Sequence, residues 1–352
     1  MRTLKILIVG ALLAGMTIPV VSQDKKSEPG EKTKPFVYVP DTVSPEFQEH
    51  MKKLPNPVLR PMAPAPDDME GWKRFHQTRE KDLEPRVVSA LKQYEPTIVE
   101  RKLGNIPVLD IKPKGWKESR QILVYLHGGA YTLASARSSL MKSAFAADAT
   151  GFRVIAVDYT VAPRAKWQQI TDEAIAVVQA LIKEGHTLKE IGMFGDSAGG
   201  GMTPGVVLKM RDQKLGMPAA LVLWSPWSDI TETGDTYVTL KNAEPTYLYE
   251  RILKQSADAY ADPKDQKHPY VSPVYGDYCK GFPPTLIQGG TKEIFLSNFV
   301  RQYQALDTAG QAVKLDLYEG MPHVFQGQLP DAPESRLAMK KMKDFFLQHL
   351  GK

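Results

Sequence analysis

The pattern of apolar and polar positions changes near residue 96 of this 352-residue chain. Upstream, Met69, Trp72 and Phe75 recur at the spacing of one helix face. Downstream, short apolar runs alternate with segments of helix length, which is typical of βαβ units. The pattern therefore predicts an α/β fold, in which a mainly parallel sheet follows a helical N-terminal segment.

Eight apolar runs are the expected strands of this sheet. They are residues 97–102, 107–111, 121–126, 153–158, 191–194, 219–224, 285–288 and 313–318. The first two runs are joined through Gly104-Asn105, which favours a tight hairpin. Residues 229–278 interrupt the alternation with a long polar and aromatic insertion.

Proline and capping residues divide the N-terminal segment into expected helices. Ser44 and Pro45 are a good N-cap and first-turn pair for a short helix that ends near Leu54. A second helix is expected around residues 69–76. Pro85 can begin a third, because proline is tolerated in the first turn of a helix.

The first 22 residues carry two cations followed by an apolar stretch that is short for a membrane span and ends in small residues. Such a segment is typical of a cleaved secretory signal peptide, and an uncleaved membrane anchor is the alternative. Residues 23–35 are charged and contain Pro and Gly, which predicts a flexible tether. We therefore expect an exported protein, periplasmic or secreted, whose mature chain has no stable membrane insertion.

Composition and charge narrow the classes of function. A single cysteine, Cys279, excludes an intramolecular disulfide framework and a cysteine-based metal site. The formal net charge is +5, and residues 1–35 contribute +3 of it. The remaining net charge of +2 on residues 36–352 is too small to indicate a nucleic-acid partner. The chain contains no H-x-x-x-H, H-E-x-x-H or acid-rich calcium loop, so we expect no metal.

The sharpest motif is Gly195-Asp196-Ser197-Ala198-Gly199, between an apolar strand and an expected helix. In this context G-x-S-x-G is typical of a nucleophile elbow, where Ser197 occupies a strained strand-to-helix turn. Upstream, His127-Gly128-Gly129-Ala130-Tyr131 follows another strand and matches an oxyanion-hole segment. The amides of Gly128, Gly129 and Ala198 are the expected oxyanion donors. We interpret His127 as a structural hydrogen-bonding residue.

Two later loops supply an acid and a base. Glu293 follows the strand at 285–288, and His323 follows the strand at 313–318. The chain order Ser197, Glu293, His323 is the order of a hydrolase triad, with each residue beyond the C-terminal end of a strand. In such a triad His323 is the general base for Ser197, and Glu293 orients the imidazole.

These motifs resemble those of the hormone-sensitive-lipase-like esterases and lipases, the alpha/beta hydrolase fold-3 family. The resemblance spans about residues 95–349 and includes Asp158-Tyr159 before Ala162-Pro163, and Ser225-Pro226-Trp227-Ser228-Asp229. It implies an α/β-hydrolase fold with a mostly parallel eight-stranded sheet flanked by helices, hydrolysis of small-molecule carboxylic esters, and no cofactor. It also implies a catalytic domain at 95–352 and a helical cap made of residues 36–94 and an insertion at about 230–275.

Two positions depart from the family pattern. Relatives with Asp beside the nucleophile more often use aspartate as the triad acid, whereas this chain has Glu293. Pro204 falls inside the helix after the elbow, where it removes one backbone hydrogen bond and is expected to kink the helix. Tyr131 and Phe325 adjoin the oxyanion and histidine loops, and we expect them to contact the substrate.

The sequence predicts an exported serine carboxylesterase that acts on short- to medium-chain acyl esters through an acyl-enzyme intermediate. A sugar-ester deacetylase, a lactonase or an amidase would use the same triad, because function resides in the pocket and not in the fold. A non-catalytic binding protein on this scaffold is a further alternative. The natural substrate, the stereoselectivity and the oligomeric state stay open.

Overall fold

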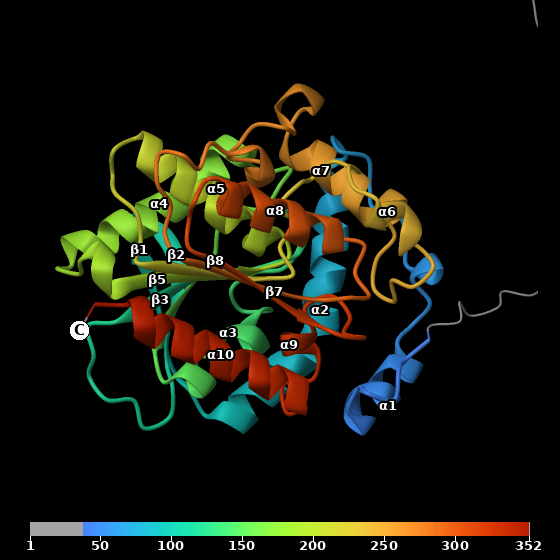
Figure 1. Ribbon diagram of the computed structural model, residues 1–352, viewed down its shortest axis with the longest axis horizontal. Coiled ribbons are helices and arrows are strands. Elements are labelled where there is room, and N and C mark those ends of the chain that lie inside the picture. Colours follow the sequence, from blue (N-terminus) through green and yellow to red (C-terminus); the bar gives the residue numbers. More distant parts are fainter. Residues whose placement is uncertain (1–37, 352) are drawn as a thin grey trace, which may run out of the picture. The chain divides into compact units, whose positions relative to one another are not determined.

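The expected strands all occur, and they form one eight-stranded sheet in the order β1-β2-β4-β3-β5-β6-β7-β8 (Figure 1). The computed structural model describes residues 38–351, so the predicted signal peptide and tether lie outside the described residues. Pairing is antiparallel between β1 and β2 and between β2 and β4, and parallel elsewhere. The strands are β1 (Thr97–Leu103), β2 (Ile106–Lys112), β3 (Ile122–Leu126), β4 (Arg153–Val157), β5 (Ile191–Asp196), β6 (Ala220–Trp224), β7 (Thr285–Gly290) and β8 (Val313–Tyr318).

Helices cover both faces of the sheet. Figure 1 shows α4, α5 and α8 over one face, and α3, α10 and the second half of α2 over the other. The helices are α1 (Pro45–Lys53), α2 (Met69–Tyr94), α3 (Leu140–Thr150), α4 (Trp167–Lys183), α5 (Ala198–Asp212), α6 (Thr236–Thr239), α7 (Lys254–Tyr260), α8 (Leu296–Thr308), α9 (Phe325–Gln328) and α10 (Pro333–His349). Short 3₁₀ or π turns are η1 (Pro57–Leu59), η2 (Leu188–Glu190), η3 (Tyr249–Leu253), η4 (Pro263–Asp265) and η5 (Pro273–Tyr275).

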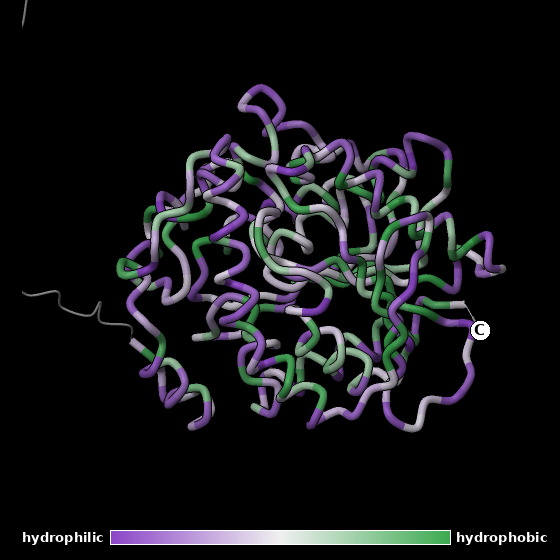
Figure 2. The backbone as a smooth tube through the Cα atoms, turned by 180° about the vertical axis from the view of Figure 1, so that it is seen from behind, coloured by the Kyte–Doolittle hydropathy of each residue, from purple (hydrophilic) through white to green (hydrophobic). Residues whose placement is uncertain are grey.

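Burial on both faces explains why the central strands are continuous apolar runs. In β3, Val124 and Leu126 join the core under α4 and α5, whereas Leu123 and Tyr125 join the core under α3 and α10. Parallel strands covered by helices on both sides need this composition, because neither face meets water. Figure 2 shows the same distribution, with hydrophobic colour concentrated in the strands and hydrophilic colour in the outer loops.

The hairpin predicted at Gly104-Asn105 is confirmed. Leu103 pairs with Ile106, and the two residues between them have φ values of 56° and 67°. Positive φ at both central positions is the requirement of the tight turn that matches the twist of paired strands. Glycine and asparagine tolerate that conformation better than other residues.

The prediction of a separate helix from Pro85 is wrong, because α2 runs unbroken from Met69 to Tyr94. Proline inside a helix removes one hydrogen bond and costs about 3 kcal/mol. The C-terminal half of α2 offsets this cost by burying Val87 and Ala90, and by stacking Tyr94 on Phe145 of α3 with ring centroids 5.8 Å apart. Pro204 likewise lies inside α5, which continues to Asp212.

The insertion after β6 is joined to the N-terminal segment by hydrogen bonds. The Ala63 amide donates to the Arg251 carbonyl at 2.8 Å, and the Arg251 guanidinium donates to the Arg60 carbonyl at 2.7 Å. The Arg60 guanidinium lies 5.4 Å from the centre of the Tyr247 ring. Segments far apart in the sequence thus form one layer beside the C-terminal ends of the strands.

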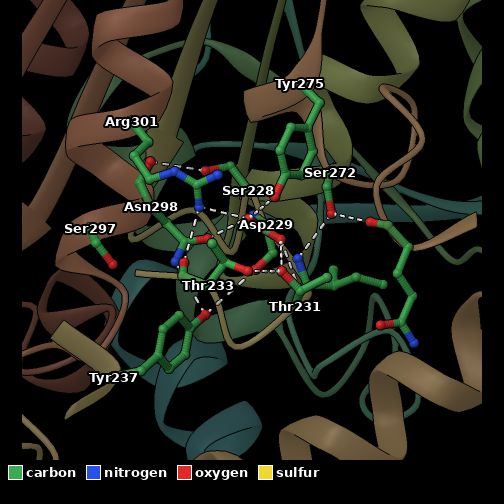
Figure 3. A network of polar contacts seen from close by, with 12 residues as sticks. Ser228, Asp229, Thr231, Thr233, Tyr237, Ser272, Tyr275, Ser297, Asn298 and Arg301 are labelled. Carbon is green, nitrogen blue, oxygen red and sulfur yellow. Dashed lines mark hydrogen bonds and ion pairs between the residues drawn. The ribbon is translucent and has the colours of Figure 1, made fainter. Parts of the chain in front are cut away.

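A buried carboxylate, Asp229, anchors both ends of this insertion (Figure 3). One oxygen accepts hydrogen bonds from the amide and hydroxyl of Thr231 at 2.9 and 2.6 Å. The other accepts from the Tyr275 hydroxyl at 2.9 Å and from Arg301 of α8 at 2.6 Å. The Asp229 amide donates to the Asn298 side chain at 2.6 Å. The network therefore ties the start and the end of the insertion to α8.

Replacing this carboxylate by an amide should destabilise the protein. We expect Asp229→Asn to lower the free energy of unfolding by about 3 kcal/mol, because an amide offers one acceptor oxygen and turns an NH₂ group toward donors. Urea unfolding followed by tryptophan fluorescence measures the change. Asp262→Asn is the matched control, because its ion pair with Lys166 is exposed and worth about 0.5 kcal/mol. Equal effects of the two substitutions would contradict the anchoring role.

Candidate active site

Ser197 lies in a tight turn between β5 and α5. Its φ of 55° and ψ of −120° are strained for any residue other than glycine. The flanking glycines are required by close approach, since a Cβ on Gly195 would lie 2.4 Å from the Gly199 carbonyl oxygen. A Cβ on Gly199 would lie 2.0 Å from the Leu126 carbonyl oxygen. The motif thus holds the Ser197 hydroxyl at the end of the sheet, before the first turn of α5.

The structure brings Ser197, Glu293 and His323 together. His323 Nε2 lies 2.8 Å from Ser197 Oγ, and His323 Nδ1 lies 2.6 Å from Glu293 Oε2. Glu293 is fully buried and His323 is 3% exposed. When Nδ1–H donates to the carboxylate, Nε2 is free to accept the hydroxyl proton. This arrangement is able to activate the serine and to stabilise a charged imidazolium.

Ser225, to which the sequence pattern assigned no role, forms hydrogen bonds that position both the acid and the base. Its hydroxyl donates to Glu293 Oε1 at 2.8 Å and accepts from the Val324 amide at 2.9 Å. The Gly290 amide donates to the same carboxylate oxygen at 2.6 Å. Oε1 is therefore held by two donors while Oε2 faces His323. The available signal was position, because Ser225 directly follows β6 at the same edge of the sheet.

The assignment of Gly128 as an oxyanion donor is wrong. Its amide already donates to Asp196 Oδ1 at 3.0 Å. The amides of Gly129, Ala130 and Ala198 have no hydrogen-bond partner within residues 38–351. Gly129 and Ala130 also line the cavity at Ser197. The sequence did not reveal this shift of one residue along the loop, because it depends on where the Asp196 side chain points.

Asp196 holds residues 127–131, the oxyanion loop, in place. Its carboxylate accepts hydrogen bonds from the Gly128 amide and the Tyr125 hydroxyl, and it forms an ion pair with Lys142 at 2.6 Å. Burial is the largest single influence and raises the pKa of Asp196, but the Lys142 charge and the hydrogen bonds from Lys142, Tyr125 and the Gly128 amide together bring that pKa below its ordinary value. His127 supports the same loop by donating from Nδ1 to the Gly128 carbonyl at 2.7 Å. Its role is structural, as expected.

Tyr131 and Phe325 do not lie on the cavity, so the expectation that they contact substrate is not met. The Tyr131 ring is fully buried and stacks on Tyr260, with centroids 3.8 Å apart. Phe325 is fully buried against Phe47 and Tyr318. Both side chains turn away from the loops whose backbone borders the site. Sequence adjacency to a functional residue did not determine their direction.

A cavity of about 640 Å³ opens onto Ser197 and His323. Its walls come from the oxyanion loop, from α2, from residues 50–61, and from the insertion at Thr246, Tyr247 and Ile252. Much of the lining is apolar, for example Phe75, Leu83, Leu133 and Met141. This size is typical of a small-molecule site.

A second buried acid, Glu244, lies behind the triad. Its carboxylate accepts hydrogen bonds from the amides of Thr246 at 2.6 Å and Ile294 at 3.1 Å. Burial raises the pKa of Glu244 to about 7, the charge of His323 opposes the rise, and the charge of Glu293 adds to it. Its burial is not visible in the sequence, since nothing in the polar insertion distinguishes this acid from its exposed neighbours.

The pKa of Glu244 predicts that stability depends on pH. Between about pH 4.5 and 7 the unfolded chain loses this proton while the folded chain keeps it, so the free energy of unfolding falls as pH rises. The fall amounts to about 3 kcal/mol at 1.36 kcal/mol per pKa unit. Glu244→Gln should remove it. Urea unfolding of both proteins across this range measures the difference, and parallel profiles would contradict the prediction.

No group of three or more His, Cys, Asp or Glu side chains suited to a metal ion occurs among residues 38–351. Within the same residues, no helix is long and apolar enough to cross a membrane.

Comparisons with known proteins agree with this geometry. A family model described as alpha/beta hydrolase fold matches residues 123–327. An acetyl-hydrolase of Streptomyces hygroscopicus is 31% identical over 274 residues, covering 75% of this chain and 89% of the relative. An esterase of Acinetobacter venetianus is 30% identical over 250 residues, covering 71% of this chain and 82% of the relative.

Solved structures give the same result. The crystal structure of one esterase has a TM-score of 0.83 at 27% identity and covers 92% of this chain and 99% of its own. A crystal structure of an esterase from the bacterial hormone-sensitive lipase family has a TM-score of 0.76 at 28% identity, with 88% and 99% covered. The chain thus belongs to the α/β-hydrolase family of hormone-sensitive-lipase-like esterases, and it is a serine hydrolase of carboxylic esters.

Proposed function

We propose that this enzyme is an exported carboxylesterase that hydrolyses short- to medium-chain acyl esters with a Ser197-Glu293-His323 triad. The observation that carries the proposal is the continuous hydrogen-bonded chain from Glu293 through His323 to Ser197, at 2.6 and 2.8 Å. Its serine end borders a cavity large enough for a small ester. A nucleophile, a base and an orienting acid in this order are the requirements of acyl transfer.

In the first half-reaction, Ser197 Oγ attacks the ester carbonyl carbon while His323 Nε2 takes the hydroxyl proton. The carbonyl oxygen becomes an oxyanion, which the amides of Gly129, Ala130 and Ala198 stabilise. When the tetrahedral intermediate collapses, the bond to the leaving oxygen breaks. His323 then gives its proton to the departing alcohol, which leaves the acyl group on Ser197.

In the second half-reaction, water takes the place of the alcohol. His323 accepts a proton from the water, whose oxygen attacks the acyl carbon of the acyl-enzyme. The second tetrahedral intermediate collapses, the bond to Ser197 Oγ breaks, and the serine recovers its proton from His323. The products are the free acid and the regenerated enzyme. Glu293 keeps its hydrogen bond to Nδ1 and offsets the charge on the imidazolium.

Residues 36–94 and the insertion at about 230–275 act as a cap in this proposal. Both segments line the cavity, through Phe75 and Leu83 from α2 and Tyr247 and Ile252 from the insertion. A cap encloses the acyl group of the bound substrate and limits its length. An apolar wall within about 640 Å³ favours acyl groups of short to medium length.

An acyl-length series tests the substrate range. The purified mature chain is assayed on p-nitrophenyl esters from acetate to dodecanoate, and kcat/KM is compared along the series. We expect the maximum between acetate and octanoate, with a fall toward dodecanoate as the chain outgrows the cavity. A maximum at dodecanoate would overturn the proposed range while leaving the triad intact.

Export rests on the sequence of residues 1–22, with two cations before a short apolar stretch. Expression of the full chain in a bacterium with a periplasm tests it. The proposal predicts protein in the periplasmic or secreted fraction with an N-terminus at Gln23. Full-length protein confined to the cytoplasmic fraction would overturn export.

A further inference from the structure

Cationic side chains are concentrated on the wall of the catalytic cavity. Arg60, Arg79, Arg86 and Lys142 all line it, whereas the acidic residues of the lining are Asp82 and Asp196. A cavity dedicated to a plain fatty acyl ester has no use for this excess of charge. The arrangement therefore bears on which ester the enzyme takes.

Two of these charges cancel each other. Lys142 forms a 2.6 Å ion pair with Asp196, and both side chains are largely withdrawn from water. Asp82 lines the cavity as an exposed residue of α2 and forms no ion pair within residues 38–351. The three arginines therefore lack a matching set of anions in the cavity.

Arg79 and Arg86 lie on the same face of α2. They are seven residues apart, and the cavity-lining positions of this helix follow helical spacing: Phe75, Thr78, Arg79, Asp82, Leu83 and Arg86. Arg86 Nη2 donates to the carbonyls of Gly327 and Gln328 at 2.5 and 3.2 Å, which fixes the guanidinium at the wall. Burial lowers the pKa of Arg86, and the neighbouring Arg79 charge lowers it further.

Arg79 and Arg60 have unused donors. Arg79 is half-buried and forms no hydrogen bond or ion pair within the described part of the chain. Arg60 lies 5.4 Å from the Tyr247 ring, and Tyr247 in turn contacts the His323 ring edge-on at 5.1 Å between centroids. The Nε atom of Arg60 is buried without a partner. Arg60 and the catalytic histidine thus both contact Tyr247 on one side of the cavity, and the other two arginines of the lining lie on α2.

We propose that these arginines bind a carboxylate carried by the ester substrate, so that the enzyme selects anionic esters over neutral ones of the same shape. This inference rests on the proposed esterase function and names its substrate class. A guanidinium presents several N–H groups in a planar fork that matches a carboxylate. A partly desolvated arginine gains most from such a partner, because its donors are no longer satisfied by water.

Two matched substrate pairs separate the positions the carboxylate can occupy. In the first pair the charge is on the acyl side, in the mono-p-nitrophenyl ester of glutaric acid against its neutral terminal amide. In the second pair it is on the alcohol side, in 4-acetoxybenzoate against 4-acetoxybenzamide. For at least one pair, we expect wild-type kcat/KM to be about 10-fold or more higher for the anion. The pair that shows the preference identifies the side that the arginines contact.

Substitutions then test whether the arginines cause the preference. Arg79→Gln and Arg60→Gln should each lower the anion-to-amide ratio of kcat/KM by about 10-fold, whereas Arg79→Lys should retain part of it. Arg74→Gln is the matched control, because Arg74 is an exposed residue of α2 outside the cavity lining and should leave the ratio unchanged. Added KCl should reduce the ratio in the wild type.

The results that overturn the proposal are distinct from those that overturn the proposed function. A wild type that prefers neither anion, or a preference that survives both Arg79→Gln and Arg60→Gln, rejects the anionic substrate class while esterase activity stands. Absence of hydrolysis of all four esters and of the p-nitrophenyl acyl series by the folded wild type rejects both proposals.

Discussion

Ser197→Ala should lower kcat on p-nitrophenyl butyrate by about 10⁵- to 10⁶-fold. The substitution removes the only atom of this side chain that is able to form the acyl-enzyme. His323 Nε2 then faces a methyl group in place of a hydroxyl at 2.8 Å. Residual hydrolysis comes from water attack assisted by the oxyanion amides and by substrate binding.

The loss must not reflect unfolding. The Ser197→Ala protein is expected to keep the backbone of the elbow, since the φ of 55° is set by the close packing of Gly195 and Gly199. Ser89→Ala is the matched control, because Ser89 is an exposed serine of α2 that has no role in the site. Thermal unfolding should be similar for the wild type and both variants. A folded Ser197→Ala protein with near wild-type kcat would remove the serine from the mechanism.

Glu293→Gln should lower kcat by about 10⁴-fold with little change in fold. The carboxylate accepts from His323 at 2.6 Å and thereby holds Nε2 in the form that accepts the serine proton. An amide is neutral, so it does not stabilise the imidazolium, and its NH₂ group favours the wrong tautomer. The rate is measured under saturating substrate, and circular dichroism checks the fold.

Glu293→Asp is the informative comparison, because it keeps the charge and shortens the reach by one methylene. Oε1 is held by Ser225 and Gly290, so a shorter side chain cannot satisfy both of these donors and His323. We expect a loss of about 10²-fold, between wild type and Glu293→Gln, since a displacement on the order of 1 Å has that effect on catalytic groups. Equal activity of Glu293→Gln and wild type would exclude this acid.

The fold was largely predictable, because its strands are buried on both faces and leave continuous apolar runs. All eight strands end within two residues of the predicted positions. The error at Pro85 has a different origin. Local propensity favours a break there, but Tyr94 packs on Phe145 and tertiary contacts carry the helix through the proline.

The candidate site was predictable where strand ends place residues at one edge of the sheet, and less so where side-chain direction decides. Chain order and strand ends pointed to Ser197, Glu293 and His323. By contrast, the side chain of Asp196 occupies the Gly128 amide, and Tyr131 turns into the core. The sequence did not predict that the arginines line the cavity either. Their positions on α2 can be read from the sequence, but the way this helix packs beside the catalytic residues cannot.

Covalent labelling of the nucleophile tests the central claim most directly. The wild type is treated with diethyl p-nitrophenyl phosphate, and intact mass, peptide mapping and residual esterase activity are followed together. The account predicts one diethylphosphoryl group per chain on Ser197, loss of activity in proportion to labelling, and no label in Ser197→Ala. Inactivation with the label on another residue, or full activity with Ser197 completely labelled, would contradict it.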